Sequence, residues 1–178
     1  DDGSLSGPPG TAEITIGNSP PQLDSVSIIP ALPRASDELI AVRHASEEDE
    51  VVLVTRDGKG LRFRQGDVRP MGRATAGVKG ITLRSGDALL SMDVVSDEAA
   101  DLFMVTEKGF GKRTAISEFR PQGRGGQGVI AMQTRRRNGN LVGAVQVFGS
   151  DEVMLISNLG TLVRTSVAEI SLLGRNTQ

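Results

Sequence analysis

The chain has no cysteine, tryptophan or tyrosine, and it has a single histidine, His44. The absence of cysteine excludes a disulfide framework and every cysteine-based metal site. One histidine cannot build a histidine-rich metal centre or a Ser-His-Asp triad within one chain, and we assign it no role. Without tyrosine there is no tyrosine nucleophile, and without tyrosine or tryptophan those rings cannot stack on nucleic-acid bases.

Long apolar runs are also missing from the sequence. No segment approaches the length that a membrane span needs, and the first residues do not follow a secretory signal pattern. No GxxxxGK[ST] sequence occurs, and GRGGQG does not follow a strand-to-helix pattern. We therefore expect a cytoplasmic protein with no membrane partner, no metal site and no cofactor bound to this chain.

The net charge of -2 hides an uneven distribution of charge along the chain. Residues 1–50 carry 10 acidic and 2 basic side chains, whereas residues 101–150 carry 3 acidic and 8 basic ones. A basic body that follows an acidic lead suits a polyanionic partner.

The most informative feature is a repeat with a period of 51 residues. The segment VVLVTRDGKGLRFRQGDVRPMGRATAGVKG, from Val51, aligns without gaps with LFMVTEKGFGKRTAISEFRPQGRGGQGVIA, from Leu102. A third copy, VMLISNLGTLVRTSVAEISLLGRNTQ, starts at Val153. Self-similarity at a period of this length is typical of propellers and solenoids.

The pattern within one unit predicts short strands. Residues 51–55 are aliphatic and β-branched, and residues 61–64 alternate apolar with basic side chains, which together predict a hairpin. Residues 129–134 and 141–147 are predicted to form a second hairpin around the Asn138-Gly139 dipeptide. Each unit therefore holds about four strands, and no stretch has a convincing helical period.

We predict an all-β fold, a propeller-like wheel of four-stranded blades with about three to three and a half blades. The predicted parts are a linker-like lead (1–26), a half-blade (27–48), two blades (49–97 and 100–148) and a partial blade (151–178). DELIAV, from Asp37, resembles DALLSM, from Asp87, at a spacing of 50 residues. Either this half-blade completes the partial blade and closes a ring, or the chain is a fragment of a larger wheel, which we favour.

Arginine recurs at two positions of the unit, one in a strand and one in a loop. The strand arginines alternate with apolar neighbours, so they are predicted to point away from the core and to form a basic rim. Such a rim is either a solvated charged face or a surface that binds phosphates, and the repetition favours phosphates. The candidate DNA-binding residues are Lys59, Arg62, Arg64, Arg69, Arg73, Lys79, Lys108, Lys112, Arg113, Arg120, Arg124, Arg164 and Arg175.

One loop is rich in glycine and amide side chains: Gln122, Gly123, Arg124, Gly125, Gly126, Gln127 and Gly128. It is either a tight connection between strands or a phosphate contact. Because glycine recurs at the equivalent positions Gly72 and Gly174, we interpret the glycines as architectural and Arg124 as the functional residue. The Arg135-Arg136-Arg137 run is either a solvated turn or a further phosphate contact.

Residues 37–178 resemble the C-terminal domain of the gyrase A subunit of bacteria, a type IIA DNA topoisomerase component, most densely in GKRTAISEFRPQ, NGNLVGAVQV, TLVRTSVAEISLLGRNTQ and DVRPMGRATAGVKGITL. The resemblance implies a β-pinwheel, a wheel whose blades exchange strands with their neighbours. It implies that duplex DNA wraps around a basic rim and that wrapping promotes negative supercoiling. It also implies that the cleaving tyrosine, the Mg2+ site and the ATPase lie elsewhere in the DNA gyrase holoenzyme, so this chain alone is not catalytic.

The partners implied by the resemblance are double-stranded DNA, the remainder of the gyrase A subunit, and the gyrase B subunit, in the nucleoid. The wrapping signature of the family is a box with the pattern Q-R-R-G-G-K-G, normally in the first blade. Gly123 and Gln127 stand where the box has arginine and lysine, so a weakened contact is expected in this loop. The alternatives are the C-terminal domain of the topoisomerase IV A subunit, against which the ending GRNTQ argues, and a propeller that binds an acidic protein.

Overall fold

The computed structural model describes residues 39–72, 75, 77–95 and 97–177. The linker-like lead, most of the predicted half-blade and the candidate Arg73 lie outside the described residues. In the described part, regular structure consists of β-strands and three short 3-10 turns. None of these turns is long and apolar enough to cross a membrane. The all-β fold class is confirmed.

The first sheet has four strands in the order β3 (Leu89–Val95), β1 (Glu50–Thr55), β2 (Lys59–Arg64) and β6 (Val129–Ile130). All neighbours are antiparallel, and the central strand β1 sets Val51 opposite both Phe63 and Val94. The predicted hairpin over residues 51–64 is therefore present.

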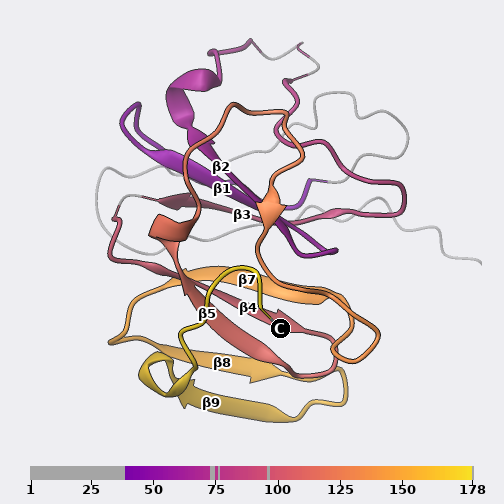
Figure 1. Ribbon diagram of the computed structural model, residues 1–178. Coiled ribbons are helices and arrows are strands. Elements are labelled where there is room, and N and C mark those ends of the chain that lie inside the picture. The colour runs from indigo at the N-terminus through magenta and orange to yellow at the C-terminus, as the bar shows by residue number, and fades with distance from the viewer. Residues whose placement is uncertain (1–38, 73–74, 76, 96, 178) are drawn as a thin grey trace, which may run out of the picture.

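The second sheet has the order β5 (Gly111–Ala115), β4 (Asp101–Thr106) and β7 (Leu141–Val147), and the third pairs β8 (Glu152–Ile156) with β9 (Leu162–Ser166). The three hairpins repeat at 51 residues, and each runs into a 3-10 turn. The sheets follow one another from top to bottom of Figure 1. We call the corresponding parts of the chain the first unit (residues 49–97), the second unit (100–148) and the third unit (151–177).

The predicted hairpin between residues 129–134 and 141–147 is wrong. β6 belongs to the second unit by sequence but pairs with β2 of the first unit, whereas β7 pairs with β4. Gly128 permits this exchange, because its φ is +65° and a Cβ there would lie 2.5 Å from the carbonyl oxygen of Gly60. The exchange of strands between units is the arrangement that the resemblance implied.

The core lies mainly between units. One cluster joins the first two units and includes Val52, Val54, Leu102, Met104 and Phe119. A smaller cluster joins the last two units through Phe103, Val147 and Val167. Burial of each large apolar side chain contributes about 1.5–3 kcal/mol, so the stability of each unit depends on its neighbours. We call these contact regions the first junction and the second junction.

Candidate nucleic-acid interface

The strand arginines Arg62, Arg113 and Arg164 each pair with an acid twelve residues earlier. The β-ladder explains the first pair: Val52 lies opposite Arg62, and Glu50, two residues from Val52, points to the same face of the sheet. The exposed fractions of the three arginine side chains are 4%, 18% and 67%. The equivalent arginines of the three units thus range from buried, at Arg62, to exposed, at Arg164.

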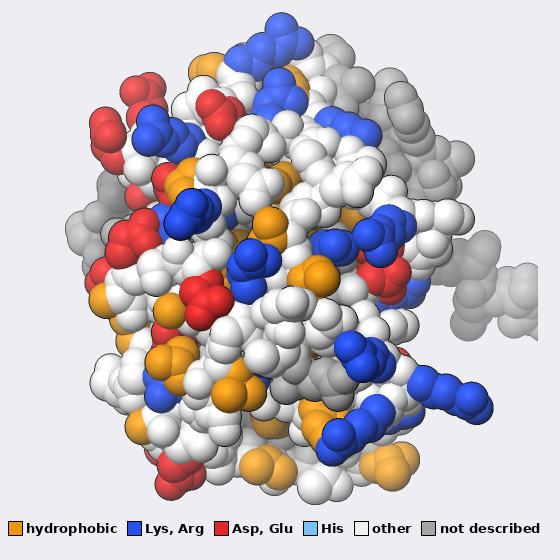
Figure 2. All heavy atoms as spheres, in the orientation of Figure 1, with side chains coloured by type: hydrophobic (Ala, Val, Ile, Leu, Met, Phe, Trp, Pro, Cys, Tyr) orange, Lys and Arg blue, Asp and Glu red, His pale blue; other side chains and the backbone are white. Residues whose placement is uncertain are grey.

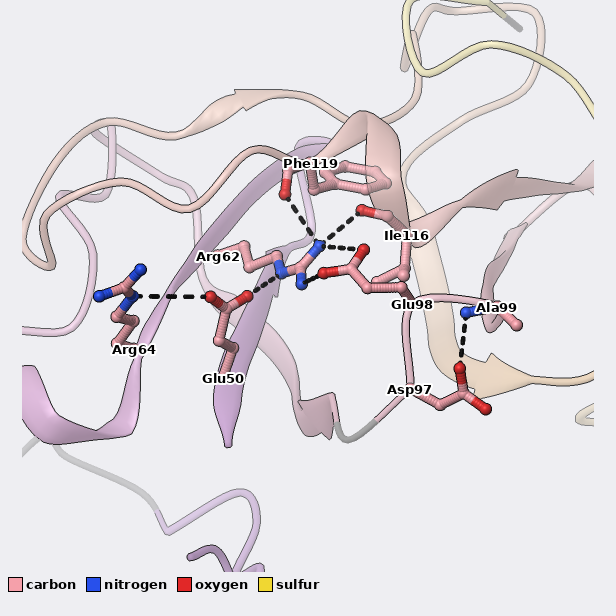
Figure 3. Close-up of polar contacts among 8 residues, drawn as sticks. All are labelled: Glu50, Arg62, Arg64, Asp97, Glu98, Ala99, Ile116 and Phe119. Atoms are coloured by element: carbon pink, nitrogen blue, oxygen red, sulfur yellow. Dashed lines mark hydrogen bonds and ion pairs between the residues drawn. The ribbon is translucent and has the colours of Figure 1, made fainter. Parts of the chain in front are cut away.

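Arg62 lies at the centre of the first junction (Figure 3). Its guanidinium donates to Glu50 across the hairpin and to Glu98 in the segment between the units. Nη1 also donates to the carbonyl oxygens of Ile116 and Phe119 of the second unit, at 3.2 and 3.4 Å. Burial opposes the charge of Arg62, but Glu98 and Glu50 outweigh this effect and raise its pKa. The same contact with Arg62 lowers the pKa of Glu98.

Arg113 repeats this arrangement at the second junction. Its Nη1 donates to Asp101 Oδ2 at 2.7 Å, and its Nε donates to the carbonyl oxygen of Ile170 at 2.9 Å. Ile170 is 51 residues after Phe119, so Arg62 and Arg113 donate to carbonyl oxygens at equivalent positions of the following unit. The strand arginine therefore links one unit to the next through hydrogen bonds, and we call such a residue a fastener.

The prediction that the strand arginines point away from the core is wrong for Arg62, and Lys112 is buried as well. Alternation along a strand places the strand arginines on one face, but the following unit covers that face. Lys112 is next to Arg113 in β5 and so lies on the opposite face, where the last turn of the chain covers it. Arg62 and Lys112 thus hold the units together and present no cation at the surface, and Arg113 is largely covered too.

The buried ammonium of Lys112 holds the last turn of the chain. Its Nζ donates to the carbonyl oxygens of Gly174, Arg175 and Thr177 at 2.7, 3.0 and 3.4 Å, and to Thr177 Oγ1 at 3.1 Å. Burial lowers the pKa of Lys112 to about 8, against the opposing effect of the Glu118 carboxylate. At neutral pH the amine is therefore still mostly protonated and supplies three N–H donors.

The glycine-rich loop at residues 122–128 is docked on the first unit. The N–H of Gly125 donates to the carbonyl of Gly80, and the N–H of Thr82 donates to the carbonyl of Gly126 at 2.8 Å. Arg124 donates from Nε to the carbonyl of Asp67 at 2.9 Å and from Nη1 to that of Lys79 at 3.3 Å. The guanidinium remains exposed, so Arg124 both positions the loop and presents a cation at the surface.

Most remaining candidates lie at the surface: Arg64, Arg69, Lys79, Lys108, Arg120 and Arg164 are exposed, and Lys59 and Arg175 are half-buried. Arg164 is paired with Glu152. Ten exposed cations have no carboxylate of the described residues within 4.0 Å: Arg56, Arg69, Lys79, Arg84, Lys108, Arg120, Arg124, Arg135, Arg136 and Arg137. Figure 2 shows Lys and Arg side chains from the top of the molecule to its lower right, with Asp and Glu more numerous along the left edge.

Two of these exposed arginines share a repeat position that the sequence analysis missed. Arg84 and Arg135 are 51 residues apart, so the 51-residue repeat could have identified them as an equivalent pair of arginines. Arg135 begins a run of three exposed arginines, in which Arg137 stacks on Phe110 with its guanidinium carbon 5.4 Å from the ring centre. Lys108 donates to the carbonyl of Arg136, which joins this run to the β4–β5 turn.

The chemistry available at this surface is charge neutralisation. Among the described residues, no three His, Asp or Glu side chains gather to hold a metal ion. Guanidinium and ammonium groups on exposed loops of successive units can donate to phosphate oxygens without reading bases. The arrangement therefore suits a phosphate backbone that passes from one unit to the next.

Comparisons with known proteins agree with this geometry. The model of a family described as "DNA gyrase C-terminal domain, beta-propeller" matches residues 49–96, 100–147 and 151–178. The gyrase A subunit of Pseudomonas aeruginosa is 51% identical over 142 residues, which are 80% of this chain and 15% of the relative. The gyrase A subunit of Escherichia coli is 49% identical over 142 residues, 80% of this chain and 16% of the relative. The chain thus spans about a sixth of the length of these relatives.

Solved structures show the same fold. The structure titled "Structure of DNA gyrase A C-terminal domain" superposes with a TM-score of 0.69 at 28% identity, over 75% of this chain and 45% of that chain. The "Crystal structure of the C-terminal domain of DNA topoisomerase IV" gives 0.70 at 26% identity, over 74% and 41%. Together with the repeated hairpins and the exchanged strand, these matches show that the chain belongs to the DNA gyrase C-terminal domain family.

Proposed function

We propose that this chain is the non-catalytic DNA-binding domain of a gyrase A subunit, where it binds duplex DNA through the phosphate backbone. The observation that carries the proposal is the set of ten exposed cations with no carboxylate of the described residues within 4.0 Å. These side chains come from the loops of the first two units, so duplex DNA that follows the units meets them in succession. Family membership supports the same partner.

The proposed mechanism is wrapping without base readout. Each neutralised phosphate releases counterions and favours binding whatever the sequence. Bending 20–30 base pairs through 40–90° costs about 1–6 kcal/mol, which several phosphate contacts can offset. In the holoenzyme, the bent segment favours negative supercoiling, while DNA cleavage and the use of ATP and Mg2+ belong to the other domains of the gyrase A and B subunits. The domain then works in the cytoplasm, on the nucleoid.

Gyrase is favoured over topoisomerase IV by sequence rather than by shape. The two solved domains superpose almost equally well, with TM-scores of 0.69 and 0.70. The identity of 51% to a gyrase A subunit supports the gyrase assignment.

The test is a gel-shift titration of the 178-residue chain on duplex DNA of random sequence over a salt series. The logarithm of the binding constant should fall linearly with the logarithm of the salt concentration, by about 0.9 per phosphate contact. A binding constant that does not change with salt concentration, or an absence of binding, would contradict the proposal. Binding to an acidic protein but not to DNA would instead support a scaffold role. A topology assay on relaxed circles, with a nicking-closing enzyme present, then separates a wrapping domain from a simple binder.

A further inference from the structure

Three consecutive arginines, residues 135–137, lie on an ordered loop that we call the arginine loop (residues 133–140). It connects β6, which pairs with the first unit, to β7 of the second unit (Figure 1). The buried side chain of Asn138 closes this loop. Its Oδ1 accepts from the N–H of Arg135 at 2.8 Å, and its Nδ2 donates to the carbonyl oxygen of Gln133 at 2.7 Å. The backbone that carries the three arginines is therefore held in one conformation.

The arginine loop is attached to the hairpin turns of both of the first two units. Thr134 Oγ1 donates to the carbonyl oxygen of Asp57, in the β1–β2 turn, at 2.9 Å. From the β4–β5 turn, Lys108 donates to the carbonyl oxygen of Arg136. The loop thus lies where the first unit meets the second.

The third arginine of the loop has an aromatic partner. The guanidinium carbon of Arg137 lies 5.4 Å from the centre of the Phe110 ring, which is within the range of a cation–π contact. The Phe110 side chain is 40% exposed, whereas Phe63, Phe103 and Phe119 are each 4% exposed or less. Stacking on an exposed ring restricts where the guanidinium points, and it leaves the positive charge free for a ligand.

The repeat shows that the ring and its arginine occur together. In the first unit, Lys59 stands at the position of Phe110, and Gly86 stands at that of Arg137. Of the three arginines, the first unit keeps only the equivalent of the first, Arg84. A ring that served only to pack the hairpin turn would be expected in both units, whereas a ring that positions Arg137 is needed only in the second.

The three guanidinium groups of the loop are available to bind an anion. All three side chains are exposed, and no carboxylate of the described residues lies within 4.0 Å of them. Glu107 lies beside Gly139 of the loop, but it forms no ion pair with these arginines. A guanidinium donates in a planar fork that matches phosphate oxygens. The chemistry of the loop therefore fits successive phosphates of a nucleic-acid backbone.

We infer that the arginine loop is a preformed phosphate-binding site at the first junction, and that Phe110 is a positioning residue that holds the Arg137 guanidinium toward the DNA backbone. A long side chain loses rotamer freedom when it binds a phosphate. Stacking in the free protein removes part of that freedom beforehand, which favours binding without adding a contact. This inference rests on the proposed function and assigns a role to a residue that carries no charge.

The experiment is a pair of double-mutant cycles, measured by fluorescence anisotropy of the 178-residue chain on duplex DNA of random sequence. Arg137→Gln should weaken binding by about eightfold at about 0.1 M salt, since one phosphate contact is lost. Phe110→Leu should weaken it by about two- to fivefold although no charge changes. Phe110→Tyr keeps a ring and should bind as the unsubstituted chain does. In the Arg137→Gln background, Phe110→Leu should have no further effect.

Arg120→Gln supplies the matched second cycle, because Arg120 is an exposed arginine of the same unit outside the loop. Phe110→Leu should weaken binding by the same factor whether or not Arg120 is replaced. Circular dichroism checks that each variant is folded. Arg137→Lys is an independent variant that leaves the ring in place, and it should weaken binding by a similar two- to fivefold because its ammonium group cannot stack as a planar group.

Two results would overturn the inference while the chain still binds DNA. One is that Phe110→Leu leaves binding unchanged. The other is that it weakens the Arg137→Gln variant as much as the unsubstituted chain, which would mean that the ring contacts DNA by itself. If the unsubstituted chain does not bind DNA at all, the proposed function is contradicted and this inference with it.

Discussion

At each junction of the wheel, a cationic side chain donates to backbone carbonyl groups of the neighbouring unit. The cation belongs to the later unit at the first junction and to the earlier unit at the second. At the first junction the aliphatic Leu61 lies beneath the loop, and Arg124 reaches from the loop to the carbonyls of Asp67 and Lys79 in the first unit. At the second junction Lys112, the equivalent of Leu61, reaches from the strand to the carbonyls of the last turn. The fold leaves carbonyl groups at each junction that need donors, but it does not fix which residue supplies them.

The strand arginine is what the two junctions share. Arg62 and Arg113 both combine a carboxylate twelve residues earlier with a carbonyl of the following unit. A repeated arginine in this fold is therefore first a fastener between units. Only cations that lie on exposed loops remain as candidates for phosphate contacts.

The largest expected effect is at Arg62. Arg62→Met should destabilise the protein by about 3 kcal/mol, because it leaves Glu50 without its buried cationic partner. Arg164→Met, at the equivalent exposed position, should change the stability of the single chain by about 0–1 kcal/mol. Urea unfolding followed by circular dichroism measures both. Equal losses would contradict the fastener role.

A smaller effect is expected at Gly128. Gly128→Ala should cost about 1–3 kcal/mol, because a side chain at φ +65° is strained and its Cβ would lie 2.5 Å from the Gly60 carbonyl oxygen. Gly77→Ala, at the equivalent position with φ +76° and open space around it, should cost less, since only the backbone strain applies. Thermal unfolding of both variants tests whether the exchanged strand at the first junction needs this glycine.

The third stability effect is the pH dependence at the second junction. Lysine titrates near 10.5 in the unfolded chain, and burial lowers the pKa of Lys112 to about 8 in the folded one. Between these values the unfolded chain binds more protons, so stability should rise with pH over this window and be independent of this group below it. Lys112→Leu, which copies Leu61, should lack that rise. If urea unfolding gives parallel pH profiles for the variant and the unsubstituted protein, the lowered pKa is wrong.

The sequence predicted the fold class, the 51-residue hairpin repeat and the exposed loop cations, since periodicity and turn residues are local signals. The predictions from sequence were wrong where contacts with a neighbouring unit determine whether a side chain is buried or which strand it pairs with. Alternation placed Arg62 on one face of its strand but could not reveal that Ile116 and Phe119 cover that face. The Asn138-Gly139 dipeptide predicted a hairpin, yet Asn138 instead bonds to Arg135 and Gln133 within a local loop. Contacts between units of a repeat have no signature in the pattern of a single unit.

The most direct test of the division between fasteners and surface cations is the salt dependence of DNA binding. Arg120→Gln should reduce the slope of log binding constant against log salt by about 0.9, the loss of one phosphate contact, with unchanged thermal stability. Arg113→Gln should lower thermal stability and leave the slope unchanged in conditions where the variant is folded. A reduced slope for Arg113→Gln together with an unchanged slope for Arg120→Gln would contradict the account.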